Sequence, residues 1–256
     1  MLRFCIFGNP IKHSISPQIH REFARQAGLE ISYVKVAPKP DQFENAVRSF
    51  QQQGGHGANI TSPFKEHAFT LCDSITERAG IAKSVNTFLF QDGKIIGDNT
   101  DGIGLIRDIT INLQYGLGGK KIMILGAGGA VRGILQPLLN EKPREIIIMN
   151  RSLDNAKKMA DEFSVDWLDT LENQTADVVI DCLPFNTTIA LPDSFLFSNN
   201  SLFYDLKYNQ IMLKNNATIK ANGLGMVVEQ AAEAFFGWTG FRPCKHSLRS
   251  CSHQDW

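Results

Sequence analysis

Short apolar runs alternate with amphipathic helical patterns along almost the whole of this 256-residue chain. The runs have the length of buried strands, and the segments between them repeat apolar residues every three to four positions, the period of a helix. Strands alternating with helices predict parallel sheets and an α/β fold class. Strands are expected at residues 3–7, 32–36, 57–60, 86–91, 121–125, 145–149, 178–181 and 202–206. Helices are expected at residues 17–27, 41–52, 129–139, 155–163 and 225–238.

A boundary between two parts of the chain is expected near residues 101–117. There, a helix and the loop QYGLGG precede a new strand–turn–helix pattern. The helix at 225–238 has apolar residues around its whole circumference, which predicts that it is well buried. The residues after it show no periodicity and are expected to form a tail.

Composition narrows the classes of partner. The chain has 26 basic and 26 acidic residues, so its balanced charge gives no support for binding nucleic acid or a membrane surface. No apolar run approaches the roughly 20 residues that span a bilayer, and the first apolar run is too short for a signal peptide. The five cysteines form no CxxC pair, which favours a reducing cytoplasm. The tail contains Cys244, His246, Cys251 and His253, but their spacing matches no zinc pattern, so no metal is expected.

A glycine-rich turn joins a strand to a helix in KKIMILGAGGAVRGILQPLL. Gly126 suits the tight turn, and Gly128 allows a pyrophosphate to approach the backbone at the helix N-terminus. Val131 stands where the dinucleotide fingerprint has its third glycine, so a tight turn without a ligand stays open as an alternative. The next strand ends at Asn150 and Arg151 without an acid, and an arginine there can accept a 2′-phosphate. A solvated loop arginine is the alternative.

Lys65 lies at a position of a predicted helix where a positive charge is unfavourable. In ANITSPFKEHA, Ser62 is expected to be an N-cap and Pro63 the first helical residue, which places Lys65 in the first turn. The helix dipole disfavours a cation there, so the lysine is a candidate functional residue, with an exposed helix lysine as the alternative.

Four more polar residues lie in loops beside predicted strands and helices. Ser14 and Ser16 lie in GNPIKHSISPQIH, Asn86 precedes an apolar strand, and Asp101 follows one in KIIGDNTDGIGLI. Ser16 and Asp101 could each be a simple N-cap. Loops that leave strands and enter helices lie at the edge of an open parallel sheet where ligands bind, which favours a site.

These segments resemble the shikimate dehydrogenase family, in order and over roughly residues 4–240. The resemblance rests on GNPIKHSISPQIH, ANITSPFKEHA, SVNT, GDNTDG, GAGGA, NRS, YDLKYN and NGLGMVVEQAAEAFFGWTG. It implies a two-domain α/β fold, with an N-terminal substrate domain and a C-terminal Rossmann-type dinucleotide-binding domain around a cleft. The substrate domain is expected at 1–101, with the final helix at about 225–240 packed back onto it, the NADP-binding domain at 102–224 and the tail at 241–256.

The resemblance also implies reversible reduction of 3-dehydroshikimate to shikimate with NADP, in aromatic amino-acid biosynthesis, by a cytoplasmic monomer or homodimer. It assigns catalysis to Lys65 and Asp101. It assigns substrate binding to Ser14, Ser16, Thr61, Asn86, Tyr208 and Gln230. It assigns NADP binding to Gly126, Ala127, Gly128, Gly129, Ala130, Asn150, Arg151, Ser152, Gly223 and Met226.

Two departures from the family pattern concern the cofactor. Residues 181–184 read Asp-Cys-Leu-Pro where the family usually has Asn-x-Thr or Asn-x-Ser, and Asn155 stands where a second basic residue is common. A quinate/shikimate dehydrogenase using NAD, or a non-catalytic relative that binds shikimate or a nucleotide, are the alternatives. Arg151 argues against the first, and retention of both Lys65 and Asp101 against the second.

Overall fold

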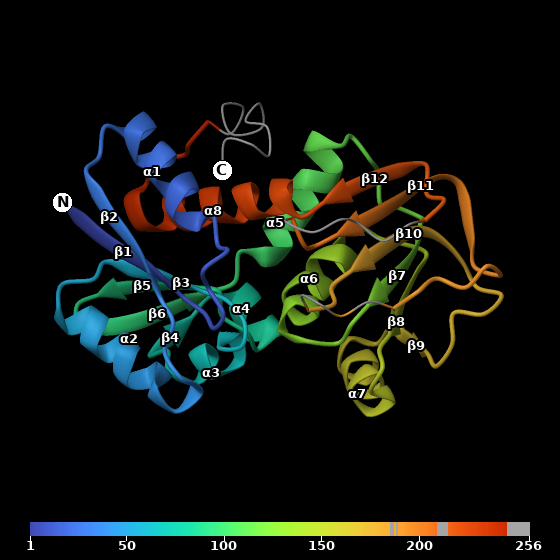
Figure 1. Ribbon diagram of the computed structural model, residues 1–256, viewed down its shortest axis with the longest axis horizontal. Helices are drawn as coiled ribbons and strands as arrows, with labels where there is room; N and C mark the ends of the chain where they lie inside the picture. The colour runs from blue at the N-terminus through green and yellow to red at the C-terminus, as the bar shows by residue number, and fades with distance from the viewer. Residues whose placement is uncertain (185–186, 188, 209–214, 245–256) are drawn as a thin grey trace. The chain divides into compact units, whose positions relative to one another are not determined.

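The computed structural model describes residues 1–184, 187, 189–208 and 215–244, which form two compact units (Figure 1). One unit contains Met1–Leu105 and the segment that starts at Val227, and the other contains Ile106–Met226. No helix in the described ranges is long and apolar enough to cross a membrane.

The first unit is built on a six-stranded sheet in the order β2-β1-β3-β5-β6-β4. Its elements are β1 (Leu2–Phe7), α1 (Ser16–Ala27), β2 (Ile31–Val36), a short 3-10 helix (Pro40–Gln42), α2 (Phe43–Gln52), β3 (Gly57–Ile60), α3 (Lys65–Thr70), β4 (Ser74–Ile75), α4 (Glu77–Ala82), β5 (Thr87–Gln91), β6 (Lys94–Asp98), α5 (Asp101–Arg107), which runs on into the second unit, and all but the first turn of α8 (Leu224–Thr239).

One strand departs from the expected parallel arrangement. β5 pairs antiparallel with both β3 and β6, while the other pairs in this sheet are parallel. Asp92 and Gly93 both have positive φ angles, of 52° and 75°, and they join β5 to β6 through a two-residue turn. An Asp-Gly turn of this kind is the common connection of a hairpin, which explains the reversal.

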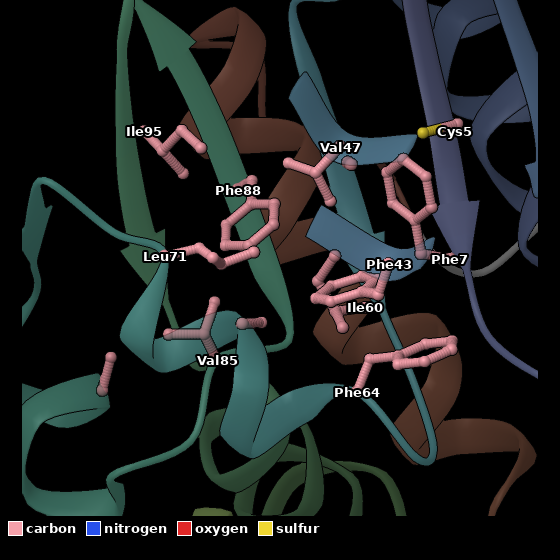
Figure 2. Packing of buried hydrophobic residues seen from close by; sticks show 13 residues of the cluster. Cys5, Phe7, Phe43, Val47, Ile60, Phe64, Leu71, Val85, Phe88 and Ile95 are labelled. Atoms are coloured by element: carbon pink, nitrogen blue, oxygen red, sulfur yellow. The ribbon is translucent and has the colours of Figure 1, made fainter. Parts of the chain in front are cut away.

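Helices cover both faces of this sheet, and β1 shows why. Its side chains point alternately to the two faces, and all of the last four are buried. Cys5 and Phe7 join a cluster with residues of α2, α3 and β5, shown close up in Figure 2. Phe4 and Ile6 face the other side, where α8 packs against α1 through Ala231 and Phe235 (Figure 1). A strand apolar on both faces therefore belongs to a sheet enclosed between helices.

The second unit contains an entirely parallel sheet in the order β12-β11-β10-β7-β8-β9. Its elements are a π-helical turn (Asp108–Asn112), β7 (Lys121–Leu125), α6 (Gly129–Asn140), β8 (Glu145–Met149), α7 (Leu153–Phe163), β9 (Asp166–Leu168), β10 (Thr175–Asp181), β11 (Leu196–Asp205) and β12 (Ile219–Asn222). The chain runs outward from β7 to β9 and then returns to β10 on the other side of β7. The strand order therefore reverses between β7 and β10, where open α/β sheets bind ligands.

Candidate active site

The segment before α3 forms a turn instead of the predicted helix start. The Phe64 N–H donates to the Thr61 carbonyl at 3.0 Å, and the helix begins only at Lys65, with Phe64 as its N-cap. Ser62 and Pro63 lie inside this turn, so the prediction of Ser62 as an N-cap was wrong. Lys65 nevertheless lies in the first helical turn, as the sequence indicated.

Lys65 is paired with a carboxylate. Its Nζ lies 2.6 Å from Oδ2 of Asp101, and the two side chains are only 16% and 7% exposed. The ion pair supplies the compensation that is missing from the local sequence, because it offsets the unfavourable helix dipole. An exposed helix lysine is therefore the wrong interpretation of Lys65.

Asp101 is fixed by a second contact. It is the first residue of α5, and its carboxylate accepts hydrogen bonds from Lys65 and, at Oδ1, from Asn86 Nδ2 at 2.8 Å. The Asn86 amide is buried, and its Oδ1 accepts from the Thr100 N–H at 2.9 Å. Asn86 Nδ2 also lies 3.5 Å from Oε1 of Gln230, on α8. Helices α3, α5 and α8, with the residue directly before β5, thus bring together Lys65, Asp101, Gln230 and Asn86.

Two buried serines lie at the start of α1, Ser14 just before the helix and Ser16 as its first residue. The Ser14 hydroxyl donates to the Ser16 hydroxyl at 3.1 Å and accepts from the Ser16 N–H at 3.3 Å. Helix α1 begins at Ser16, and its N-cap is Ile15, which makes no side-chain capping hydrogen bond. The alternative that Ser16 is a simple N-cap is therefore wrong. Thr61 follows β3, and its N–H donates to the carbonyl of Phe7.

A buried amide network missed by the sequence reasoning connects these groups. Asn59 Oδ1 accepts from the Tyr33 hydroxyl at 2.7 Å and lies 3.1 Å from Nε2 of His20, while Asn59 Nδ2 lies 3.2 Å from the Thr87 hydroxyl. The Thr87 hydroxyl donates to Asn86 Oδ1 at 2.9 Å. Burial lowers the pKa of His20 to about 3, so the ring is neutral. The only sequence signal was that Asn59 is a polar residue within a short, otherwise non-polar strand, β3.

A tight glycine-rich turn joins β7 to α6. Gly126 has φ +119°, and a Cβ there would lie 3.4 Å from the backbone of Cys182. Gly128 is the N-cap of α6, and a Cβ built on it would meet nothing within 4 Å among the described residues. The turn thus leaves space at Gly128, directly before Gly129 and Ala130 of the first helical turn, where an anion is favourable. Ala127 lies between the two glycines.

The end of β8 presents an exposed arginine. Arg151 and Ser152 are exposed, and the Asn150 side-chain amide donates to the Ser152 carbonyl at 3.0 Å. Ser152 is the N-cap of α7. The turn after β8 therefore places a cation beside a helix N-terminus, an arrangement suited to an anionic group.

Three other candidates lie at the opposite half of this sheet. Tyr208 is half-buried after β11, and Met226 is buried at the start of α8. A Cβ on Gly223 would lie 2.0 Å from the Leu206 carbonyl oxygen, so only glycine fits there. The candidate metal ligands His246, Cys251 and His253 lie outside the described residues. Within the described ranges no three His, Cys, Asp or Glu side chains gather as a metal site.

The departure at residues 181–184 contains a buried charged group. Lys207 Nζ lies 2.8 Å from Asp181 Oδ2 and 3.2 Å from Asp205 Oδ1. Burial raises the pKa of Asp205, opposed by the hydrogen bonds and charge of Lys207. We refer to Asp181, Asp205 and Lys207 as the charged triad. No local pattern connects Asp181 with Lys207, because they lie 26 residues apart in the chain.

Comparisons with known proteins agree with this geometry. A model of the shikimate dehydrogenase substrate binding domain matches residues 6–88, and one described as shikimate / quinate 5-dehydrogenase matches residues 110–195. A protein of Chromobacterium violaceum named shikimate dehydrogenase (NADP(+)) is 43% identical, with 94% of both chains covered. A protein of the same name from Vesicomyosocius okutanii is 44% identical, covering 95% of this chain and 96% of that one.

The chain belongs to the shikimate dehydrogenase family. A crystal structure of shikimate 5-dehydrogenase from Thermus thermophilus, in complex with NADP(H) and shikimate, is also similar. Its TM-score is 0.88 at 28% identity, with 100% of both chains covered. These comparisons confirm the family resemblance and the α/β fold class that were expected from the sequence of this chain.

Proposed function

We propose that this enzyme catalyses the reversible NADP-dependent reduction of 3-dehydroshikimate to shikimate, a step of aromatic amino-acid biosynthesis. The observation that carries this proposal is the Lys65–Asp101 pair, held in place by Asn86. Relatives of more than 40% identity named shikimate dehydrogenase (NADP(+)) support the same activity. We also propose a cytoplasmic monomer or homodimer without nucleic-acid or membrane partners.

Lys65 and Asp101 are proposed to act on the oxygen that changes between carbonyl and hydroxyl. Reduction leaves negative charge on this oxygen, and a proton has to be delivered to it. The Lys65 ammonium donates a hydrogen bond to the oxygen and then the proton. Asp101 holds the ammonium at 2.6 Å and accepts from Asn86, so the donor is oriented before the substrate arrives. In the oxidative direction Lys65, as the neutral amine, takes the proton back.

The other polar residues of the first unit are proposed to orient the substrate. Ser14 and Ser16 present paired buried hydroxyls suited to a carboxylate. Thr61, Asn86 and Gln230 are proposed to bind the ring hydroxyls and the carboxylate end, and Tyr208 of the second unit to reach the substrate as well. A carboxylate at one end and a reacting oxygen at the other fix the ring against both serines and Lys65, which favours a single reactive orientation.

The second unit is proposed to hold NADP. Gly126, Ala127, Gly128, Gly129 and Ala130 would hold the pyrophosphate, because the turn leaves space at the N-terminus of α6. Asn150, Arg151 and Ser152 would bind the 2′-phosphate, and Gly223 and Met226 would lie near the nicotinamide. The bound cofactor supplies the hydride.

The function is tested by turnover with four pairs of substrate and cofactor. Shikimate and quinate are each offered with NADP and with NAD, and nucleotide reduction is followed by absorbance. We expect shikimate with NADP to give the highest kcat/KM. Quinate with NAD as the best pair would support the alternative enzyme, and binding of shikimate without turnover would support a non-catalytic relative.

Arg151 is expected to decide between the two cofactors. Arg151→Ala removes the guanidinium proposed to bind the 2′-phosphate, a charge-assisted contact worth about 1.5–3 kcal/mol. The KM for NADP should therefore rise by roughly tenfold to a hundredfold, while the KM for NAD should change little. Arg144→Ala is a matched control, because this exposed arginine lies at the opposite end of β8 and pairs with Asp177. Equal rises for both cofactors would contradict the assignment.

A further inference from the structure

The charged triad connects the loops that follow two neighbouring strands. Asp181 ends β10 and Asp205 ends β11, and Lys207 follows two residues later. The Lys207 ammonium lies within hydrogen-bond distance of both carboxylates and 3.5 Å from the Leu183 carbonyl. Asp181 Oδ1 accepts from the Leu183 N–H, and Asp205 Oδ1 accepts from the Lys207 N–H, both at 2.9 Å.

All three side chains are withdrawn from solvent. Those of Lys207, Asp181 and Asp205 are 6%, 0% and 1% exposed. Burial of charges is costly unless they are paired, and here one ammonium serves two carboxylates. With both carboxylates ionised, the triad carries a net charge of −1. Because little water lies around it, this charge acts on neighbouring groups with weak screening.

The position of the triad points to one end of the cofactor, an inference that rests on the proposed function. Dinucleotides bind across the point where strand order reverses, one half of the fold for each nucleotide. Arg151 after β8 is the proposed contact of the adenosine 2′-phosphate, and Gly126 after β7 that of the pyrophosphate. The nicotinamide must therefore lie toward β10 and β11, the strands whose last residues are Asp181 and Asp205. Cys182, directly after Asp181, donates its N–H to the carbonyl of Leu125, the residue before Gly126, at 2.9 Å.

The two oxidation states of the cofactor differ in charge at this end. The nicotinamide ring of NADP⁺ is a cation, and the dihydronicotinamide ring of NADPH is neutral. A buried group with a net negative charge stabilises the first relative to the second. We propose that the charged triad is an electrostatic element that strengthens binding of NADP⁺ relative to NADPH.

Binding of the two nucleotides tests this directly and needs no turnover. Kd is measured for NADP⁺ by calorimetry and for NADPH by its fluorescence, with wild type, Asp181→Asn and Asp205→Asn. Each variant keeps the shape of the side chain and brings the net charge of the group to zero. We expect the ratio of Kd for NADP⁺ to Kd for NADPH to rise, on the order of threefold to tenfold.

A double variant separates charge from structure. Asp181→Asn with Lys207→Met removes one charge of each sign and leaves Asp205, so the net charge returns to −1. Burial favours uptake of a proton by the unpaired Asp205, so the ratio should return toward that of wild type as the pH rises and this carboxylate ionises, although more side chains have changed. Lys207→Met alone is less informative, because two unpaired buried carboxylates favour uptake of a proton. 2′-Phospho-ADP-ribose lacks the nicotinamide, and its Kd should have a similar value in all these proteins.

Several outcomes would overturn the proposal. If Asp181→Asn and Asp205→Asn change both Kd values by the same factor, the triad only supports the loops. If the double variant keeps the raised ratio of Asp181→Asn even at alkaline pH, where Asp205 is ionised, the net charge is not the cause. Failure of the proposed function looks different, because neither nucleotide would bind, or both would bind with the expected ratios and no shikimate would be oxidised.

Discussion

Lys65→Ala is expected to lower kcat by about 10²–10⁴, the usual range for loss of a general acid–base group. The KM for shikimate should change much less, because the proposed substrate contacts of the two serines, Thr61 and Gln230 stay in place. A loss confined to kcat is typical of an interaction made mainly in the transition state. Steady-state kinetics with shikimate and NADP measures both constants.

Asp101→Asn is the companion variant. It keeps an acceptor for Asn86 but removes the charge that orients the lysine, so turnover should also fall. The double variant should lose less than the product of the two single losses, because the paired residues act as a unit. Lys94→Ala, at an exposed position at the start of β6, is the control and should behave as wild type. A near-native kcat for Lys65→Ala would make the lysine a binding residue only.

Phe64→Ala is expected to lower the free energy of unfolding by about 3–5 kcal/mol, the usual cost of removing a buried phenylalanine ring. Phe64 is fully buried and stacks on Phe43, with ring centroids 4.4 Å apart and an angle of 1° between the planes (Figure 2). It is also the N-cap of the helix that begins with Lys65. Urea unfolding followed by circular dichroism measures the loss.

The position of Phe64 predicts a second effect. A cavity beside the first turn of α3 frees Lys65 from its fixed orientation, so kcat should fall even where the protein is still folded. Phe64→Leu retains most of the apolar volume and should cost roughly half as much stability. An unchanged free energy of unfolding in Phe64→Ala would show that the stacked pair of rings contributes little to this core.

The regular elements could be predicted because their signals are local. β7 and β8 are continuous apolar runs beside helical patterns, and the structure has both strands where the sequence predicted them. The short strands β4, β9 and β12 have two to four residues, too few for a pattern to stand out. The hairpin between β5 and β6 did carry a signal, the Asp-Gly pair, which the expectation of parallel strands passed over.

In the candidate site, too, the sequence predicts the residues with local signals but not the contacts made only in the folded chain. Lys65 stood out because it conflicts with a helix dipole, and that conflict is visible within a few residues of sequence. Its pairing with Asp101 depends on packing between segments 36 residues apart, which local rules do not describe. Asn59 was missed for this reason too, because only the folded sheet brings it to Tyr33 and Thr87. The same holds for the charged triad.

The discontinuity of the first unit has a consequence for its synthesis. Its sheet is encoded before Leu105, but the helix that packs on α1 and contributes Gln230 belongs to the segment after Val227. At about 5–20 residues per second, the ribosome takes roughly 6–24 s to translate the second unit between them. During that interval the apolar face later covered by α8 has no partner within its own unit, while the second unit is continuous and can fold on emergence. Newly made chains are therefore expected to depend on chaperones at this stage, and a stop codon just before α8 would leave the first unit without the helix that covers it.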